Sequence, residues 1–118
     1  MNISTTVSGN YELVLDAKGT TTEGMRIART LALGNVSQVL VEITPAEISE
    51  KYSGGPADVT FKLVDGTSVK VVNGFGVGYS GTGPTGVYDI LVKDLGLPED
   101  EAKKVFVPWN TKLLFHVK

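Results

Sequence analysis

The 118-residue sequence contains no cysteine, and this absence removes several chemistries at once. Without thiols the chain has no disulfide scaffold, no thiolate metal site and no cysteine nucleophile. The first residues, Met-Asn-Ile-Ser-Thr-Thr, also lack the basic region and the long apolar core of a signal peptide. Both absences are typical of a reducing compartment, so the sequence predicts a cytoplasmic protein.

Positive charge is scarce as well. The chain carries 11 basic and 13 acidic side chains, a formal net charge of −2, and its only arginines are Arg26 and Arg29. Nonspecific affinity for duplex nucleic acid requires many clustered Lys and Arg side chains, so we do not expect this partner. No apolar run is long enough to span a bilayer, and we expect no membrane partner either.

What remains is the composition of an ordinary globular domain. The 42% hydrophobic and 20% charged residues argue against disorder. A chain of this length is typical of one domain and can bury a core without a metal or a disulfide. No repeat, low-complexity tract or linker divides the sequence, so we expect residues 1–118 to form a single domain.

Strand patterns alternate with signals for short helices. Residues 20–33 fit a helix capped by Thr20 and ended by Gly34, although their apolar residues also alternate as in a strand; we prefer the helix. Further helices are expected after Thr44, near Gly83 and after Pro98. Strands are expected over residues 3–7, 11–16, 36–43, 59–72 (a hairpin) and 112–117. This mixed order predicts an α+β fold with a mostly antiparallel sheet and two to four short helices.

The hairpin turn at Asp65-Gly66 gives the sharpest structural prediction. A two-residue turn would place Phe61 opposite Lys70 and mix the two faces of the hairpin. A three-residue loop with a left-handed Gly66 places Phe61 opposite Val69 instead, which keeps one face apolar and is therefore favoured. The residues expected on the buried face are Val59, Phe61, Val69 and Val71. The residues expected on the other face are Thr60, Lys62, Ser68 and Lys70.

The strongest functional signal is the glycine-rich segment over residues 73–86, which we interpret as a loop with six glycines in fourteen residues. Glycine lets backbone amides approach a ligand and permits the left-handed conformations of anion-binding nests. The helix that follows adds a positive dipole at its N-terminus, where phosphate is favoured. The segment's hydroxyl groups could donate to a ligand, and its aromatic rings could stack on a base. The candidate ligand-binding residues here are Phe75, Gly76, Gly78, Tyr79, Ser80, Gly81, Thr82, Gly83 and Thr85.

One alternative and one missing motif limit this interpretation. The alternative is that the glycines serve only as tight turns between sheet and helix. The segment also matches no established phosphate motif, because it lacks the Gly-Lys-Ser/Thr ending of a P-loop. Residues 76–81 spell G-x-G-x-x-G, but the βαβ frame and the acidic residue about twenty positions further on are missing.

Three residues outside the segment complete the predicted ligand site. Arg26 and Arg29 lie three positions apart and would share one helical face. Paired guanidinium groups suit a pyrophosphate, whereas the alternative is a solvated face together with Glu23. Trp109 is either a platform for stacking on a base or an anchor in the core or at an interface.

No residue pattern identifies a reaction. His116 is the only histidine, and no histidine–carboxylate pair can be assembled into a triad. Asp89 and Asp94 lie five positions apart in a helix and should diverge, while Glu99-Asp100-Glu101 is typical of a helix N-terminus. A small nuclease or hydrolase would lack a visible general base. We therefore expect no catalytic residues, no metal and no cofactor.

The segment Gly78-Tyr79-Ser80-Gly81-Thr82-Gly83-Pro84, followed by an amphipathic helix, resembles the Gly-Tyr-Gly-x-x-Gly-Pro segment of small phage and mobile-element proteins. With its size and composition, the chain also resembles phage anti-defence sponges, which counter Thoeris or cyclic-oligonucleotide immunity by sequestering the signal nucleotide without cleaving it. The resemblance carries over no ligand residue. It implies a homo-oligomer in the host cytoplasm that binds a cyclic ADP-ribose isomer or a cyclic nucleotide.

Together these observations predict a noncatalytic protein that binds and sequesters a small phosphorylated ligand. The alternative is a structural or interaction module of a phage or mobile element. A surplus of large apolar residues near the C-terminus also predicts a symmetric homo-oligomer through residues 105–117, with Trp109 as anchor, unless these residues pack inward. The residues in question are Leu97, Phe106, Trp109, Leu114 and Phe115.

Overall fold

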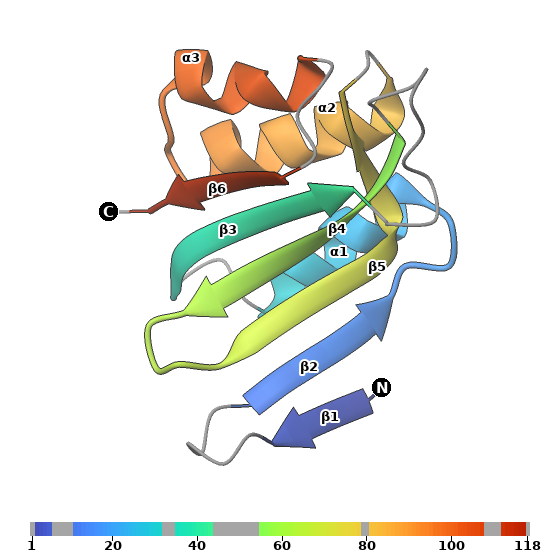
Figure 1. Ribbon diagram of the computed structural model, residues 1–118, viewed down its shortest axis with the longest axis vertical. Helices are drawn as coiled ribbons and strands as arrows, with labels where there is room; N and C mark the ends of the chain where they lie inside the picture. The colour runs from blue at the N-terminus through green and yellow to red at the C-terminus, as the bar shows by residue number, and fades with distance from the viewer. Residues whose placement is uncertain are drawn as a thin grey trace.

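In a computed structural model, a six-stranded sheet carries the helices on one of its faces (Figure 1). The structure describes residues 2–5, 11–31, 35–43, 55–78, 81–107 and 112–117. In spatial order the strands are β1 (Asn2–Thr5), β2 (Tyr11–Asp16), β5 (Ser68–Val77), β4 (Gly55–Leu63), β3 (Val36–Ile43) and β6 (Lys112–His116). Within this part of the chain the pair β2–β5 is parallel and the other neighbours are antiparallel. The predicted α+β class with a mostly antiparallel sheet is confirmed.

The helices follow the predicted order. They are α1 (Thr21–Leu31), α2 (Thr82–Asp89) with its π-helical continuation η2 (Ile90–Asp94), and α3 (Glu99–Ala102) with its 3₁₀ continuation η3 (Lys103–Phe106). The chain leaves η2 at Gly96, whose φ is +72°, and the Leu97 N–H donates to the Leu91 carbonyl at 2.9 Å. Gly96 therefore ends this helix. None of the helices in the described ranges is long and apolar enough to cross a membrane.

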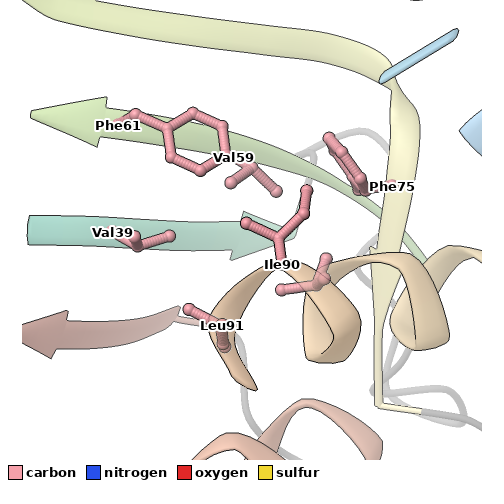
Figure 2. A pocket seen from close by; sticks show the side chains of 7 residues that line it. Val39, Val59, Phe61, Phe75, Ile90 and Leu91 are labelled. Carbon is pink, nitrogen blue, oxygen red and sulfur yellow. The ribbon is translucent and has the colours of Figure 1, made fainter. Parts of the chain in front are cut away.

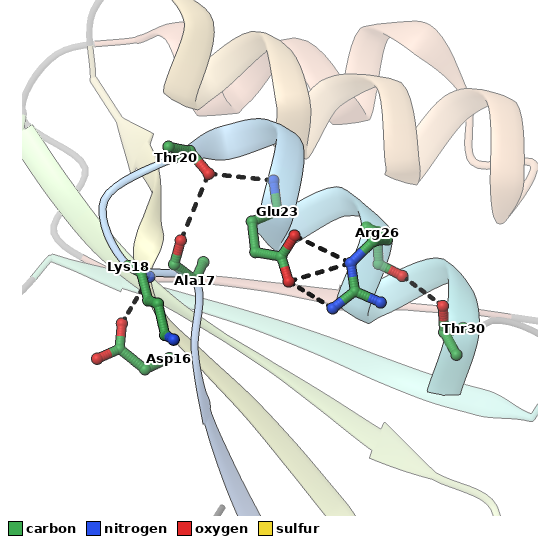
Figure 3. A network of polar contacts seen from close by, with 7 residues as sticks. All are labelled: Asp16, Ala17, Lys18, Thr20, Glu23, Arg26 and Thr30. Carbon is green, nitrogen blue, oxygen red and sulfur yellow. Dashed lines mark hydrogen bonds and ion pairs between the residues drawn. The ribbon is translucent and has the colours of Figure 1, made fainter.

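The helix preferred for residues 20–33 is confirmed by α1, and its cap explains where it begins. The Thr20 Oγ1 accepts a hydrogen bond from the Glu23 N–H at 3.3 Å. The Glu23 carboxylate turns forward to Arg26 instead of back to Thr20, so only half of the predicted capping box forms (Figure 3). The predicted end of the helix at Gly34 and the helix predicted after Thr44 lie outside the described residues.

The hairpin between β4 and β5 has the predicted register. The Leu63 N–H donates to the Thr67 carbonyl at 2.7 Å and closes a three-residue loop, in which Gly66 has a φ of +93°. Phe61 lies opposite Val69, and all four residues expected on the apolar face are buried. Keeping one face apolar therefore selects this register.

The glycine-rich segment is not a loop over its whole length, and the prediction is wrong for residues 73–77. β5 continues to Val77 because β4 begins at Gly55, earlier than expected, and pairs with it: Ala57 lies opposite Phe75, and Gly55 opposite Val77. A register shift between Ala57 and Val59 accommodates a bend at Asn73, whose φ is +60°. Phe75 and Val77 thereby enter the core as alternate residues of a strand.

The core fills the space between the sheet and the helices (Figure 2). Val39, Val59 and Phe61 of the sheet face η2, where Ile90 and Leu91 are 1% and 0% exposed. The amphipathic helix expected after Pro84 therefore packs its apolar residues against the sheet. Each fully buried side chain of this size contributes about 1.5–3 kcal/mol through the hydrophobic effect.

The predicted surplus of apolar residues near the C-terminus is wrong for two residues. Leu97 and Phe115 are buried, because α3 and β6 close the core that the other helices begin. Phe106 packs against Tyr88 with 5.5 Å between the ring centroids. Leu114 is 50% exposed on the other side of β6, and Trp109 lies outside the described residues.

The contact between α1 and α2 depends on Gly86, and we expect Gly86→Ala to destabilise the protein. A Cβ at this position would lie 2.3 Å from Thr21 Cγ2. Overpacking should cost about 1–3 kcal/mol, more than the roughly 1 kcal/mol that Ala gains over Gly in a helix. The double variant Gly86→Ala/Thr21→Ser removes the clashing methyl group and should recover most of the loss. Denaturant unfolding measures both, with Thr21→Ser alone as the control. A Gly86→Ala protein more stable than the parent would contradict the close contact.

Candidate functional site

The parallel pair β2–β5 brings two helix N-termini together. Parallel neighbours end at the same end of the sheet, and here each is followed by a helix on the same face: α1 follows β2, and α2 follows β5. In α/β arrangements, ligands bind beyond the carboxyl ends of such strands. A hollow of about 300 Å³ lies at this point. It is lined by Gly19, Thr21, Pro56, Asn73, Gly74, Phe75 and Gly83.

The floor of this hollow is the bend of β5 against the loop before α1. The Ala17 N–H donates to the Val72 carbonyl at 2.9 Å, and the Gly19 N–H donates to the Asn73 carbonyl at 2.6 Å. A Cβ at Gly74 would lie 2.6 Å from the Ala17 Cβ and 3.2 Å from the Thr20 carbonyl oxygen. Glycine is therefore required at position 74 for the loop to approach the strand.

Asp16 fixes the rim of the hollow. Its Oδ1 accepts hydrogen bonds from the Lys18 N–H at 2.7 Å and from the Asn73 Nδ2 at 3.1 Å. Both hydrogen bonds lower the pKa of the Asp16 carboxyl group below its usual value, and the bond from the Lys18 backbone has the larger effect. Lys18 itself has a φ of +57°, a conformation that most side chains avoid. The Asp16 carboxylate thus stabilises an unfavourable turn directly before the helix.

The first turn of α2 offers backbone donors. Gly81 is its N-cap, and no side chain of the described residues caps this end. The Thr85 N–H donates to the Gly81 carbonyl at 3.0 Å, and Pro84 has no N–H. The amides of Thr82 and Gly83 precede the first intrahelical hydrogen bond and need acceptors from outside the helix.

The first turn of α1 faces the same hollow through Thr21. The Thr20 side chain uses the Glu23 amide, and the Thr21 and Thr22 amides lie before the first intrahelical hydrogen bond. Two helix dipoles therefore point their positive ends toward one hollow that is lined by glycines. Chemically, this arrangement favours an anion such as a phosphate group.

Part of the predicted ligand set lies here. Gly83 and Phe75 line the hollow, and Thr82 and Thr85 are exposed on the first turn of α2 beside the half-buried Gly81. The Phe75 ring is only 4% exposed and belongs to the core, so the expected stacking on a base does not fit this residue.

Gly76 and Gly78 do not line the hollow, contrary to expectation. Gly76 is buried opposite Pro56 in the sheet. The Gly78 N–H donates to the Val105 carbonyl at 2.7 Å, so it already has a partner in η3. Gly76 is thus a residue of the sheet, and Gly78, whose φ is +86°, makes the turn that follows β5.

The two arginines do not reach the hollow either. Arg26 forms an ion pair with Glu23 one turn earlier, with Nε 2.9 Å from Oε2, and this pair lowers the pKa of the Glu23 carboxyl group. Arg29 Nε lies 3.0 Å from Asp94 Oδ2 and links α1 to η2. Arg26 instead lines another hollow of about 380 Å³, together with Lys18. The solvated face with Glu23 is the arrangement observed for Arg26.

The remaining predicted residues, Tyr79, Ser80 and Trp109, lie outside the described residues. Sequence reasoning missed the contribution of the loop before α1. Its signal is Lys18-Gly19-Thr20-Thr21, a cation, a glycine and two hydroxyl residues between a strand and a helix. In the sequence alone this signal is weak, because only the nonlocal pairing of β2 with β5 brings this loop to the start of α2.

Acidic and histidine side chains do not gather into a site. The described ranges contain no group of three or more such residues that could hold a metal ion. Asp89 pairs with Lys93 at 3.6 Å and Asp94 with Arg29, so the two carboxylates diverge as predicted. His116 is exposed on β6, with its Nδ1 3.3 Å from Gln38 Nε2.

No family model, no curated protein and no solved structure matches the chain.

The role of Asp16 predicts a pH-dependent effect of Asp16→Asn. Because folding lowers the pKa of this carboxyl group, its contribution to stability is present above the unfolded pKa of about 3.9 and is lost as the pH falls through the folded pKa. We expect the variant to melt at a lower temperature than the parent at neutral pH, and the difference to shrink in acid. Thermal unfolding across the acidic range measures it.

A double-mutant cycle tests the link between Asp16 and Asn73. Asn73→Gly removes the side-chain donor but suits the positive φ at this position. Its partner in the cycle is Asp16→Ala, because Asp16→Asn would keep an oxygen that can accept this hydrogen bond. Asp16→Ala and Asn73→Gly should be less than additive, because each removes the same hydrogen bond. Strict additivity, or a melting difference that is independent of pH, would show that the carboxylate does not support the turn.

Proposed function

We propose that this chain binds a small phosphorylated ligand at the hollow between α1 and α2 and does not convert it. The observation that carries the proposal is the meeting of two helix N-termini around a hollow lined by glycines. By the resemblance of residues 78–84, the ligand is a nucleotide-derived immune second messenger, a cyclic ADP-ribose isomer or a cyclic oligonucleotide. The protein would then be a phage anti-defence sponge that acts in the host cytoplasm.

Recognition would rest on backbone donors. Phosphate oxygens would accept hydrogen bonds from the first-turn amides of α2, where Thr82 and Gly83 precede the first intrahelical bond. The hydroxyl of Thr21 and the amides of α1 would approach from the other side. The volume of about 300 Å³ is at the lower end for a ligand pocket, so the hollow would hold the phosphate and one side of the ligand.

Binding without chemistry is supported by the side chains around the hollow. Its lining contains glycine, proline, threonine, asparagine and phenylalanine, none of which is a general base. The carboxylate on the rim, Asp16, accepts two hydrogen bonds and has a lowered pKa, which makes it a weaker base. A ligand bound in this hollow would therefore dissociate without chemical change.

A second function is favoured by the packing of the glycines. Gly74 and Gly86 are required by close approach of Ala17 and Thr21, and Gly76 lies within the sheet. These glycines need no ligand to explain them. If all of the glycine content serves packing, the chain is a structural or interaction module without a small-molecule ligand.

Substitutions at Thr82 separate the contribution of its backbone amide to ligand binding from that of its side-chain hydroxyl group. Thr82 is the first residue of α2, a position where proline is well tolerated, and the preceding Gly81 has the extended backbone that proline requires (φ 174°). Thr82→Pro removes the amide donor, whereas the control Thr82→Ala keeps the amide and removes only the hydroxyl group. A lost hydrogen bond to a charged group should weaken binding roughly tenfold or more in the proline variant. The alanine variant should bind nearly as well as the parent.

The measurement is a thermal-shift panel of cyclic nucleotides and ADP-ribose isomers, followed by titration of any hit. The bound ligand is then released by heating and analysed. Intact ligand supports sequestration, and altered ligand indicates an enzyme instead. A panel without any shift, or equal binding by both Thr82 variants, would overturn the proposed site and leave the interaction module as the better interpretation.

A further inference from the structure

The parallel pairing of β2 with β5 brings a carboxylate to the end of the sheet where α2 begins. In folds that bind dinucleotides, a glycine-rich turn leads from a strand into a helix N-terminus. An acidic residue about twenty positions further on, at the end of the next parallel strand, holds a ribose hydroxyl group. In this chain the parallel neighbour of β5 is β2, and Asp16 is the last residue of β2. Asp16 therefore has the corresponding place in the sheet, although it precedes the glycine-rich segment in the sequence.

One oxygen of the Asp16 carboxylate holds the turn, and the other is available to a ligand. Oδ1 accepts the hydrogen bonds from the Lys18 N–H and the Asn73 Nδ2, whereas Oδ2 accepts none from the described residues. The side chain is exposed, and its lowered pKa, due first to the Lys18 backbone bond, keeps it ionised at neutral pH. An ionised carboxylate accepts hydrogen bonds and donates none. Oδ2 is thus an acceptor for hydroxyl groups, and the bonds to Oδ1 fix its position.

Asp16 also connects two hollows. Its partner Asn73, 3.1 Å away, lines the hollow between α1 and α2. Asp16 itself lines the other hollow, of about 380 Å³, which lies between β2 and α1. Lys18 lines this second hollow and Gly19 lines the first, so consecutive residues of one turn belong to the two linings. The hollows therefore lie on either side of this turn, and Asp16 lies where they meet.

The second hollow combines an apolar floor with a guanidinium group. Its floor is formed by Leu15 of β2, which is half-buried, and by Ile27 of α1, which is 7% exposed. Arg26 lines the same hollow, and both oxygens of the Glu23 carboxylate hold its guanidinium group (Figure 3). A planar guanidinium group stacks on aromatic rings. An apolar floor beside a guanidinium group in a fixed position suits the flat face of a nucleobase.

We propose that the ligand is a nucleotide bound across both hollows, with its ribose hydroxyl groups donating hydrogen bonds to Asp16 Oδ2. This inference rests on the proposed function, because the phosphate occupies the hollow between α1 and α2. The base lies on Leu15 and Ile27, beside Arg26. Phosphate, ribose and base are joined in this order in a nucleotide, and the first hollow, Asp16 and the second hollow follow in the same order in the protein.

The Asp16 carboxylate also narrows the class of nucleotide. A phosphate ester at the 2′ or 3′ oxygen of the ribose would remove a hydrogen-bond donor and bring a second negative charge to Asp16. Dinucleotide-binding folds use an arginine instead of an acid where they accept a 2′-phosphate. Asp16 therefore favours a ligand with free ribose hydroxyl groups over a cyclic oligonucleotide, whose ribose units are joined through one of these oxygens.

Ribonucleotides and their dideoxy counterparts test the role of Asp16. The probes are the 5′-diphosphates of adenosine, guanosine, cytidine and uridine, their 2′,3′-dideoxy counterparts, and inorganic pyrophosphate. The parental protein should bind at least one ribonucleotide roughly tenfold or more tightly than its dideoxy counterpart, because hydrogen bonds to a charged acceptor are lost. Asp16→Ala should bring this ratio of affinities close to one. Isothermal titration calorimetry measures the affinities.

Three further variants serve as controls. Asn73→Gly loosens the same turn but keeps the carboxylate, so it should retain the parental ratio. The ratio compares two ligands on one protein, so a partly unfolded variant does not distort it. If Asp16→Ala does not fold, Asp16→Asn should still lower the ratio, because it offers only a neutral acceptor. Arg26→Ala should weaken nucleotide binding more than the matched control Arg29→Ala does, since Arg29 does not line the second hollow, and both should bind pyrophosphate alike.

The outcomes separate this inference from the proposed function. Equal binding of ribonucleotides and dideoxynucleotides by the parental protein, or a ribose preference that survives Asp16→Ala, overturns the inference. If pyrophosphate binds, Thr82→Pro abolishes this binding and no nucleotide binds more tightly, the inference fails and the proposed phosphate site stands. If neither pyrophosphate nor any nucleotide binds, the proposed function fails together with the inference.

Discussion

The pairing of β2 with β5 is the constraint on which the rest of the structure depends. These strands are far apart in the sequence, yet their parallel register continues past Asp16 through backbone bonds from Ala17 and Gly19 to β5. Because the two strands run in the same direction, the helices that follow them must begin at the same end of the sheet. The hollow, the contact between α1 and α2 and the bend at Asn73 all follow from this one pairing.

Close approach has consequences for how the glycines are interpreted. At Gly74 and Gly86, a Cβ would lie within 2.6 Å and 2.3 Å of a neighbouring carbon atom, so these positions bring backbone against backbone and helix against helix. Because Gly74 and Gly83 have no side chains, they also leave the hollow beside them unfilled. Packing and ligand binding are thus not alternatives at every glycine, because tight packing below creates the hollow above.

The features that depend on local sequence patterns were predicted correctly, whereas the contacts that depend on pairing between distant strands were missed. The hairpin register followed from keeping Phe61 and Val69 on one apolar face, and α1 followed from the cap at Thr20. The part of the candidate site that precedes α1 was missed, because nothing local shows that the loop around Gly19 meets the bend of β5. The continuation of β5 through Phe75 was hidden for a related reason: its partner residues at the start of β4 read as a turn. Glycine density therefore marked the right region but not the right backbone atoms.

Asp16 connects the parallel strand pair to the rim of the hollow. This residue lies opposite Val72 of β5, and its carboxylate accepts hydrogen bonds from the Lys18 N–H and from the Asn73 side chain. The turn that brings Gly19 and Thr21 to the bend of β5 therefore depends on a charged group at the end of the same pairing that brings the two helices together. The geometry of the hollow and the pairing of β2 with β5 are thus stabilised by one side chain, which local sequence patterns do not reveal.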